Sequence, residues 1–107
     1  MAFEALETAV QLVEALAPLE TKLRGRRKSL ADELGRAAES IALNLSEGRM
    51  RAGLDRRDLW WRAAGSAAEV TVALRLARAT GCVAASELAA VDALLDRVRA
   101  MLWRLTH

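Results

Sequence analysis

The sequence has very few of the residues that build disulfides, β-sheets or aromatic clusters. Among its 107 residues there are one Cys, one Pro, one Phe and no Tyr, and aromatic residues make up 4% of the chain. The single cysteine, Cys82, cannot form an internal disulfide, so the chain has no need of an oxidising compartment. Ala and Leu supply most of the 53% apolar fraction, and this composition favours an all-helical chain.

Long apolar runs and an N-terminal targeting pattern are also missing. No stretch approaches the roughly 18 to 20 apolar residues that are needed to span a bilayer. The opening segment, MAFEALETAV, carries two Glu and no basic residue, whereas a signal peptide begins with a positively charged region. We therefore expect a soluble, cytoplasmic protein with no membrane partner.

Apolar residues that recur at intervals of three and four predict four amphipathic helices in one domain, residues 1–107. The predicted helices cover residues 3–23, 29–47, 55–80 and 86–105. Ser29 and Asp55 are candidate N-terminal caps, Gly48 and Gly81 are candidate C-terminal stops, and Pro18 should kink or break the first helix. Because all connections are short, neighbouring helices should be antiparallel, which gives an all-α, up-down-up-down four-helix bundle.

The core stripes follow from the same spacing. In the first helix we place Leu6, Ala9, Val10, Val13, Leu16 and Ala17 in the core; in the second Leu30, Leu34, Ala37, Ala38, Ile41 and Leu45; in the fourth Leu88, Val91, Leu95, Val98, Leu102 and Leu105. Adjacent Trp60 and Trp61 point about 100° apart, so one should be in the core and the other exposed or at an interface. Stacking of a tryptophan on a nucleic-acid base is a further interpretation. We expect Trp103 to be a half-buried cover, Cys82 a packing residue and His107 disordered.

The third predicted helix is apolar on two sides. One stripe comprises Leu59, Ala63, Ala67, Val70, Leu74 and Ala77, and the opposite stripe comprises Trp61, Gly65, Ala68, Val72 and Leu76. A helix with two apolar sides is normally buried on both, whereas a bundle of this size buries only one. We interpret the second stripe as a surface for self-association. A wide core stripe in an Ala-rich monomer is the alternative.

Polar residues form a stripe beside the apolar face of the second helix. This stripe comprises Arg36, Ser40, Asn44 and Glu47. Ser66 and Glu69 on the third helix are candidate hydrogen-bond partners for it. We interpret the six residues as a network that fixes the packing of helices or subunits, since an unpaired buried polar group costs about 1–3 kcal/mol. An active site with Glu47 and Glu69 as paired carboxylates is the alternative. No His, Cys or metal-binding spacing supports it, so we expect no enzyme, metal or cofactor.

These residues also carry a resemblance to a known family. The segment RAAESIALNLSEG, residues 36–48, is followed by DLWWRAAGSAAEVTVALRLARATG, residues 58–81. Together they resemble the four-helix-bundle proteins encoded in intervening sequences of bacterial 23S rRNA genes, a family related to the accessory variability proteins of diversity-generating retroelements. The likeness covers residues 29–83, with Ala42 where the family usually has Pro. It implies a ring of subunits, typically a homopentamer, and a role related to nucleic acid.

The basic residues are concentrated in the middle of the chain. Residues 22–62 hold eleven basic and six acidic residues, whereas residues 1–21 hold four acidic residues and no basic one. The first connection contains Lys22, Arg24, Arg26, Arg27 and Lys28, and the second is surrounded by Arg49, Arg51, Arg56 and Arg57. In the predicted bundle the two clusters lie at opposite ends, roughly 30 Å apart.

We therefore expect a non-enzymatic oligomer that binds RNA or DNA electrostatically through these basic residues, as an accessory to a nucleic-acid enzyme. A ring would multiply the cations that each subunit presents, and phosphate binding scales with their number. No motif for reading bases is present. The alternative is a homo-oligomeric scaffold that binds a protein partner, with the basic loops as solvated surface.

Overall fold

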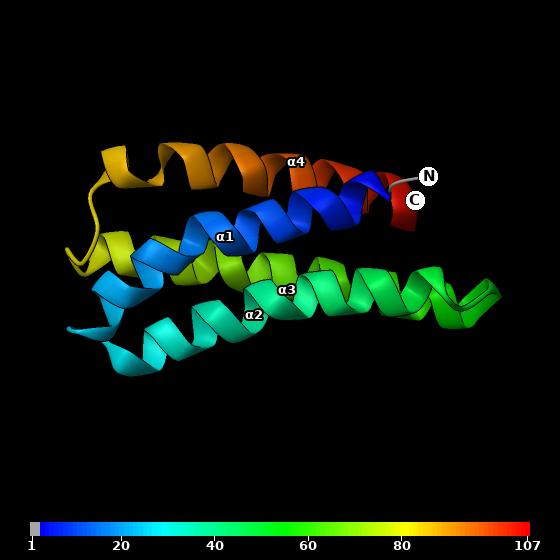
Figure 1. The fold of residues 1–107 in the computed structure, drawn as a ribbon, viewed down its shortest axis with the longest axis horizontal. Helices are drawn as coiled ribbons and strands as arrows, with labels where there is room; N and C mark the ends of the chain where they lie inside the picture. The colour runs from blue at the N-terminus through cyan, green and yellow to red at the C-terminus, as the bar shows by residue number, and fades with distance from the viewer. Residues whose placement is uncertain (1–2) are drawn as a thin grey trace.

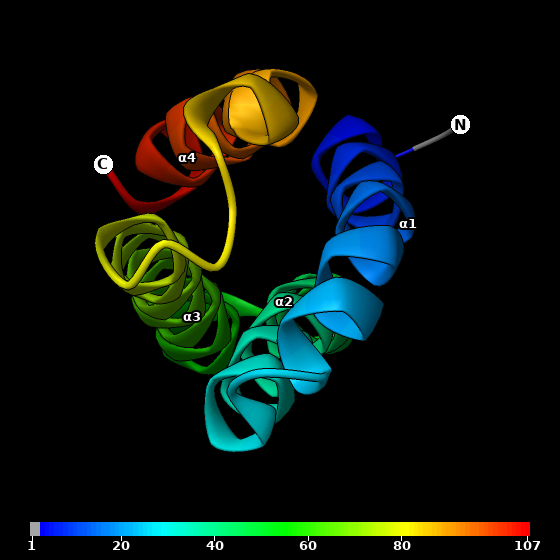
Figure 2. The same ribbon diagram turned by 90° about the vertical axis from the view of Figure 1, so that its left-hand side faces the viewer.

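The structure is a computed structural model that describes residues 3–107, and it shows four long helices in an antiparallel bundle (Figure 1). The elements are α1 (Glu4–Arg24), α2 (Lys28–Arg49), α3 (Gly53–Ala79), the short 3-10 helix η1 (Ala85–Leu88) and α4 (Ala89–Thr106). Along the bundle axis each helix packs against the next one in the chain, and α4 returns to α1 (Figure 2). The predicted all-α bundle is confirmed. None of the described helices combines the length and apolarity required to cross a bilayer.

The helix ends differ in part from the predicted ends. α1 passes through Pro18 and continues to Arg24, so the helix is not broken there. The turn that follows is very tight, because the carbonyl of Leu23 accepts from the N–H groups of both Arg26 and Arg27, at 3.0 and 2.7 Å. α2 consequently begins at Lys28, with no side-chain cap. Ser29 therefore lies inside the first turn, and its prediction as a cap is wrong.

The glycines behave differently from one another. Gly81 ends α3 as predicted: its φ is 73°, and the N–H of Cys82 after it donates to the carbonyl of Ala77 at 2.9 Å. α2, by contrast, continues past Gly48 to Arg49. α3 begins at Gly53, two residues before Asp55, so Asp55 lies in the first turn and does not cap the helix.

The core is built from leucines and alanines on the inner face of each helix. The predicted stripes of α2, α3 and α4 are buried apart from their end residues Leu30, Leu59 and Leu105, which are half-buried. In α1 the predicted stripe is rotated from the observed one. The buried residues are Ala5, Thr8, Ala9, Leu12, Leu16, Leu19 and Leu23. Leu12 and Leu19, which were not predicted, are buried in line with Leu16 and Leu23. Val10 and Ala17, which were predicted, face solvent.

Candidate nucleic-acid interface

The basic turn between α1 and α2 is attached to the connection between α3 and α4. Both lie at the same end of the bundle, opposite the turn between α2 and α3 (Figure 1). Lys22 Nζ donates to both carboxylate oxygens of Glu87, at 2.8 and 2.7 Å. Arg26 Nη1 donates to the carbonyl oxygen of Gly81 at 3.0 Å. These contacts fix the basic turn to a second segment of the chain, so its cations are held in place.

The charges at this end do not cancel. Arg24 and Lys28 both pair with Asp32, and the hydrogen bond from Arg24 is the main reason that the pKa of Asp32 is lowered. The pKa of Glu87 is lowered chiefly by its hydrogen bonds from Lys22. Within residues 3–107, Arg26 and Arg27 have no carboxylate within ion-pair distance. Three of the five predicted phosphate-binding residues thus pair with two carboxylates, and the guanidinium groups of the other two have no acidic partner among residues 3–107.

Cys82 is buried next to these two arginines. Its exposed fraction is 3%, which confirms the prediction of a packing residue. The hydroxyl of Thr80 donates to its sulfur at 3.4 Å, and this hydrogen bond is the largest cause that lowers the pKa of the thiol, followed by the nearby charge of Arg26. The buried thiol therefore packs directly beneath the basic turn.

The arginines around the second turn are mostly engaged within the chain. Arg56 donates from Nε to the carbonyl of Gly48 at 3.1 Å and from Nη2 to that of Arg49 at 3.0 Å, so its side chain caps the end of α2. Arg49 lies over the ring of Phe3, 5.2 Å from its centroid. Arg51 pairs with Glu47 at 3.3 Å. Among the described residues only Arg57 of this set has no recorded partner, so this turn is less suited to phosphate than the sequence indicates.

The predicted polar stripe is divided into three groups. Ser66 Oγ donates to Ser40 Oγ at 2.8 Å, and Asn44 Nδ2 donates to the carbonyl oxygen of Ser40 at 2.9 Å and to its Oγ at 3.0 Å. This cluster joins α2 to α3 in a region that is largely shielded from solvent.

The two remaining groups are exposed ion pairs. Arg36 bridges Glu33 and Glu69, and its hydrogen bonds lower the pKa of Glu33. Glu47 pairs separately with Arg51, about three helical turns from Arg36. Glu47 and Glu69 therefore do not form a carboxylate pair, and no group of residues in the described chain is arranged to hold a metal. Glu33 is not among the predicted residues of the stripe, although its i, i+3 spacing from Arg36 indicates that the two side chains can pair.

The second apolar stripe of α3 faces away from the core. Trp61, Val72 and Leu76 are 44%, 53% and 48% exposed, and Gly65 and Ala68 are exposed as well. A Cβ atom added to Gly65 would meet nothing within 4 Å. The stripe borders a hollow of about 340 Å³ towards α2, lined in part by Leu30, Val72 and Leu76. The single chain thus leaves an apolar strip of α3 uncovered along most of the helix.

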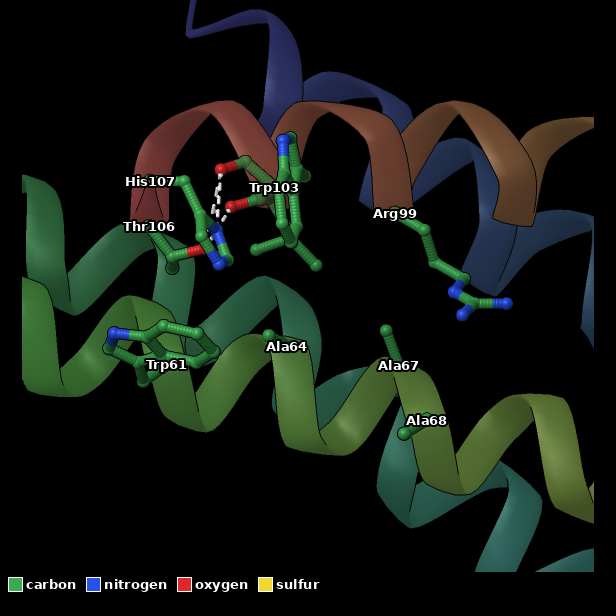
Figure 3. A pocket seen from close by; sticks show the side chains of 9 residues that line it. Trp61, Ala64, Ala67, Ala68, Arg99, Trp103, Thr106 and His107 are labelled. Atoms are coloured by element: carbon green, nitrogen blue, oxygen red, sulfur yellow. Dashed lines mark hydrogen bonds between the residues drawn. The ribbon is translucent and has the colours of Figure 1, made fainter.

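A second hollow lies between α3 and α4, and aromatic residues form one wall of it (Figure 3). Trp61 faces it from α3, and Trp103 and His107 face it from the end of α4. The ring of His107 stacks on that of Trp103 with 3.4 Å between centroids, so the expected disorder of His107 is not observed. Trp103 is 61% exposed and is not the half-buried cover that was predicted. It is exposed because the α3 residues opposite it are small: Ala64, Ala67 and Ala68.

Trp60 and Trp61 point to different environments, as predicted. Trp60 is half-buried, and its Nε1 donates to the carbonyl of Leu45 at 3.3 Å.

The helices and their polar cross-links define a small, all-α bundle with one strongly basic end. The sequence matches the family described as 23S rRNA-intervening sequence protein over residues 1–104, and the chain belongs to that family. A crystal structure of a protein of unknown function from the S23 ribosomal protein family of Bacteroides thetaiotaomicron has the same fold, with a TM-score of 0.87 over 95% of this chain and 97% of that one. The two sequences are 15% identical, so this likeness concerns the fold alone. A comparison with curated proteins finds no match.

Proposed function

We propose that the protein is a non-enzymatic, cytoplasmic homo-oligomer that binds RNA or DNA electrostatically at the end formed by the α1–α2 turn. One observation carries the proposal: Arg26 and Arg27 lie in a turn fixed to the α3–α4 connection and have no carboxylate partner in residues 3–107. Guanidinium groups bind phosphate oxygens in a bidentate way, and their prior fixation lowers the entropy that binding would cost. The intervening-sequence family is named for an rRNA gene, which is consistent with RNA as the partner.

A single basic turn offers few cations for phosphate, and self-association would bring the basic turns of several subunits to one ligand. The uncovered stripe of α3, with Gly65 and Ala68 allowing close approach, supports a subunit interface there. The family resemblance suggests a ring of five subunits and an accessory role beside a nucleic-acid enzyme. In such a ring the basic turns of all subunits would act on one ligand, and binding would weaken steeply with salt.

The other candidate is a homo-oligomeric scaffold whose partner is a protein. The same exposed apolar stripe favours it, because a continuous apolar surface on a helix is a typical site for docking another protein. In a scaffold the basic turn would be solvated surface, and nucleic acid would have no effect on assembly. The two candidates therefore differ in what the α1–α2 turn does.

The test is fluorescence anisotropy of a labelled structured RNA and a labelled DNA duplex, titrated with nucleic-acid-free protein from 50 to 300 mM salt. The informative variant is Arg27→Ala with Lys28→Ala, since neither residue makes the Arg26 contact that anchors the turn. A matched control is Arg97→Ala with Arg104→Ala, which removes the same charge from exposed positions of α4. We expect binding with a steep log–log salt slope that the first variant weakens and the control leaves nearly unchanged.

Two results would overturn the proposal. The first is an absence of binding at 50 mM salt, which would favour the scaffold. The second is an equal loss of affinity in the turn variant and the α4 control, which would mean that only net charge matters. Unchanged helical content by circular dichroism would verify that both variants are folded.

A further inference from the structure

The hollow between α3 and α4 continues into a second hollow at the same end of the bundle. The first has a volume of about 260 Å³ and the second about 240 Å³, and Thr106 and His107 line both. Each is smaller than the roughly 300–1,000 Å³ of an ordinary small-molecule site. Together they suit a ligand with two linked parts, one in each hollow.

The chemistry of the two hollows is complementary. In the first, α3 contributes Trp61 and three alanines, while α4 contributes Trp103 and, one turn earlier, Arg99, with His107 following at the end of the chain (Figure 3). This arrangement provides flat, apolar surface for an aromatic ring. The second contains Arg56 and Arg57 next to Trp60. An aromatic ring joined to an anion fits both.

The charges select the same kind of ligand. Among the described residues that line the two hollows, the charged ones are three arginines, with no acidic residue. A nearby hollow between α2 and α3 is different, since Glu47, Asp55 and Asp58 line it beside two arginines that pair with Glu47 and Asp58. The α3–α4 cleft therefore favours a negatively charged ligand, whereas the acidic residues that line its neighbour at the same end of the bundle outnumber the arginines there.

We infer that the α3–α4 cleft binds one unpaired nucleotide of a single strand, with the base displacing the ring of the terminal His107 from Trp103 and with the adjoining phosphates at Arg57 and Arg99. Base stacking on aromatic side chains accepts any base, because each has a π face. The inference rests on the proposed function, since the strand is part of the same nucleic acid that the basic turn binds. It adds a preference that the turn alone cannot give, namely single-stranded over fully paired ligands.

The cleft shares Trp61 and Ala68 with the outer apolar stripe of α3, so it is open only when subunits meet through the rest of that stripe. Val72 and Leu76 lie towards α2 and the opposite end of the helix, where they line a different hollow. Trp103 and His107 belong to α4 and are not part of the α3 stripe. A subunit contact confined to Val72 and Leu76 leaves Trp103 of the cleft accessible.

The experiment compares three labelled RNAs by anisotropy: a short oligoadenylate, an abasic strand of the same length, and a blunt duplex with the same number of phosphates. The key variant is Trp103→Ala, and its control is Leu43→Ala, which truncates an apolar side chain 69% exposed on α2. Trp103→Ala should weaken oligoadenylate binding about fivefold to a hundredfold and leave the abasic strand and duplex unchanged. Leu43→Ala should change none of the three. Arg99→Gln should lower the log–log salt slope for oligoadenylate by about one.

The outcomes separate this inference from the proposed function. If oligoadenylate binds no better than the abasic strand, or if Trp103→Ala has no effect, the cleft is not a nucleotide site, while loss of binding in the Arg27→Ala, Lys28→Ala variant would still support the basic turn. If Trp103→Ala dissociates the oligomer in sedimentation, the cleft is a subunit contact and the inference is wrong. If none of the RNAs binds, both fail. Quenching of tryptophan emission by oligoadenylate that persists in Trp60→Phe would support the stacked base directly.

Discussion

Gly48 of α2 lies directly against the indole ring of Trp60 on α3. A Cβ atom at Gly48 would be 2.6 Å from Nε1 and 2.7 Å from Cδ1 of Trp60, while the same Nε1 donates to the carbonyl of Leu45. The guanidinium of Arg56 covers the ring at 5.4 Å and donates to the carbonyl of Gly48. The glycine is thus needed for the close approach of two helices and does not serve to end one.

Gly48→Ala should therefore destabilise the protein. Alanine normally stabilises a helix interior by roughly 0.5–1 kcal/mol relative to glycine, whereas forcing a methyl group into a packed contact typically costs about 1–3 kcal/mol. We expect the contact to dominate and the free energy of unfolding in urea to fall by about 1–2 kcal/mol. The control is Gly25→Ala, at φ −66° with its nearest atom 3.6 Å away, which should be neutral or slightly stabilising. If the free energy of unfolding of Gly48→Ala equals or exceeds that of the unchanged protein, the close contact between Gly48 and Trp60 is contradicted.

Ser40 and Ser66 should be energetically coupled. Ser40 Oγ accepts hydrogen bonds from both Ser66 and Asn44, so Ser40→Ala leaves the hydroxyl of Ser66 without its acceptor and Asn44 with only its hydrogen bond to the carbonyl oxygen of residue 40. We expect Ser40→Ala to lower the free energy of unfolding by about 1–3 kcal/mol and the double change with Ser66→Ala to cost less than the sum. A double-mutant cycle by urea unfolding measures the coupling, which should be about 0.5–1.5 kcal/mol. Strict additivity would indicate that the hydrogen bond contributes nothing.

The ion pair of Lys22 and Glu87 should appear in the acid limb of the stability profile. The pKa of Glu87 is lowered from 4.5 in the folded state, so its contribution to stability is present above the unfolded value and is lost as the pH falls through the folded one. Lys22→Met removes the main cause, and the loss of stability between about pH 5 and pH 3 should become smaller. Urea unfolding at several pH values measures this. Arg104→Met, which removes an equal charge elsewhere, should leave the slope unchanged; an equal effect would point to net charge alone.

Glu20 should have the opposite dependence. Partial burial, followed by the nearby Glu39, raises its pKa above 4.5, so the stability it contributes is present below the unfolded value and lost as the pH rises through the folded one. Glu20→Gln should therefore raise the free energy of unfolding near neutral pH, by less than about 1 kcal/mol because the site is largely solvated. The difference from the unchanged protein should vanish below about pH 4, where Glu20 is protonated. A difference that persists at low pH would mean that charge is not its cause.

The proposed self-association should depend on the outer apolar stripe of α3. Val72→Arg places a charge in the exposed apolar stripe and should shift the protein towards monomer in sedimentation at fixed concentration, with unchanged helical content. Leu43→Arg makes the same change on α2 and should leave the assembly intact. If both variants dissociate it, the interface extends beyond α3, and if neither does, the stripe is not the interface.

The bundle could be predicted because its helices have a clear apolar period and short connections. The stripes predicted on α2 and α4 were correct because Leu, Val and Ile mark one face of each helix, and on α3, which is apolar on two sides, the stripe predicted for the core is the buried one. α1 was misread because alanines and valines occur on several of its faces, and only contact with α2 and α4 selects Leu12 and Leu19. The role of Gly48 also needed the structure, since nothing in the sequence shows that Trp60 lies against it.

The candidate site could be predicted only in part. Clustering of cations in the first connection was visible, but the difference between the two turns was not. Arg56 and Arg26 look alike in the sequence, yet Arg56 caps the carbonyls of α2 and Arg26 anchors a turn to Gly81. The aromatic cleft was missed because Trp61 and Trp103 are far apart in the chain.

Polar cross-links between helices are unevenly distributed, and this has a consequence for how the bundle opens. α2 and α3 are joined along their length by the contacts of Arg36 with Glu69, Ser40 with Ser66 and Leu45 with Trp60. Among residues 3–107, no hydrogen bond or ion pair joins α3 to α4, which pack through apolar side chains and, beyond the end of α4, through the ring contact of Trp61 with His107. Amide protons of α4 should accordingly exchange with solvent through partial opening, while those in the middle of α2 and α3 exchange only when the whole protein unfolds.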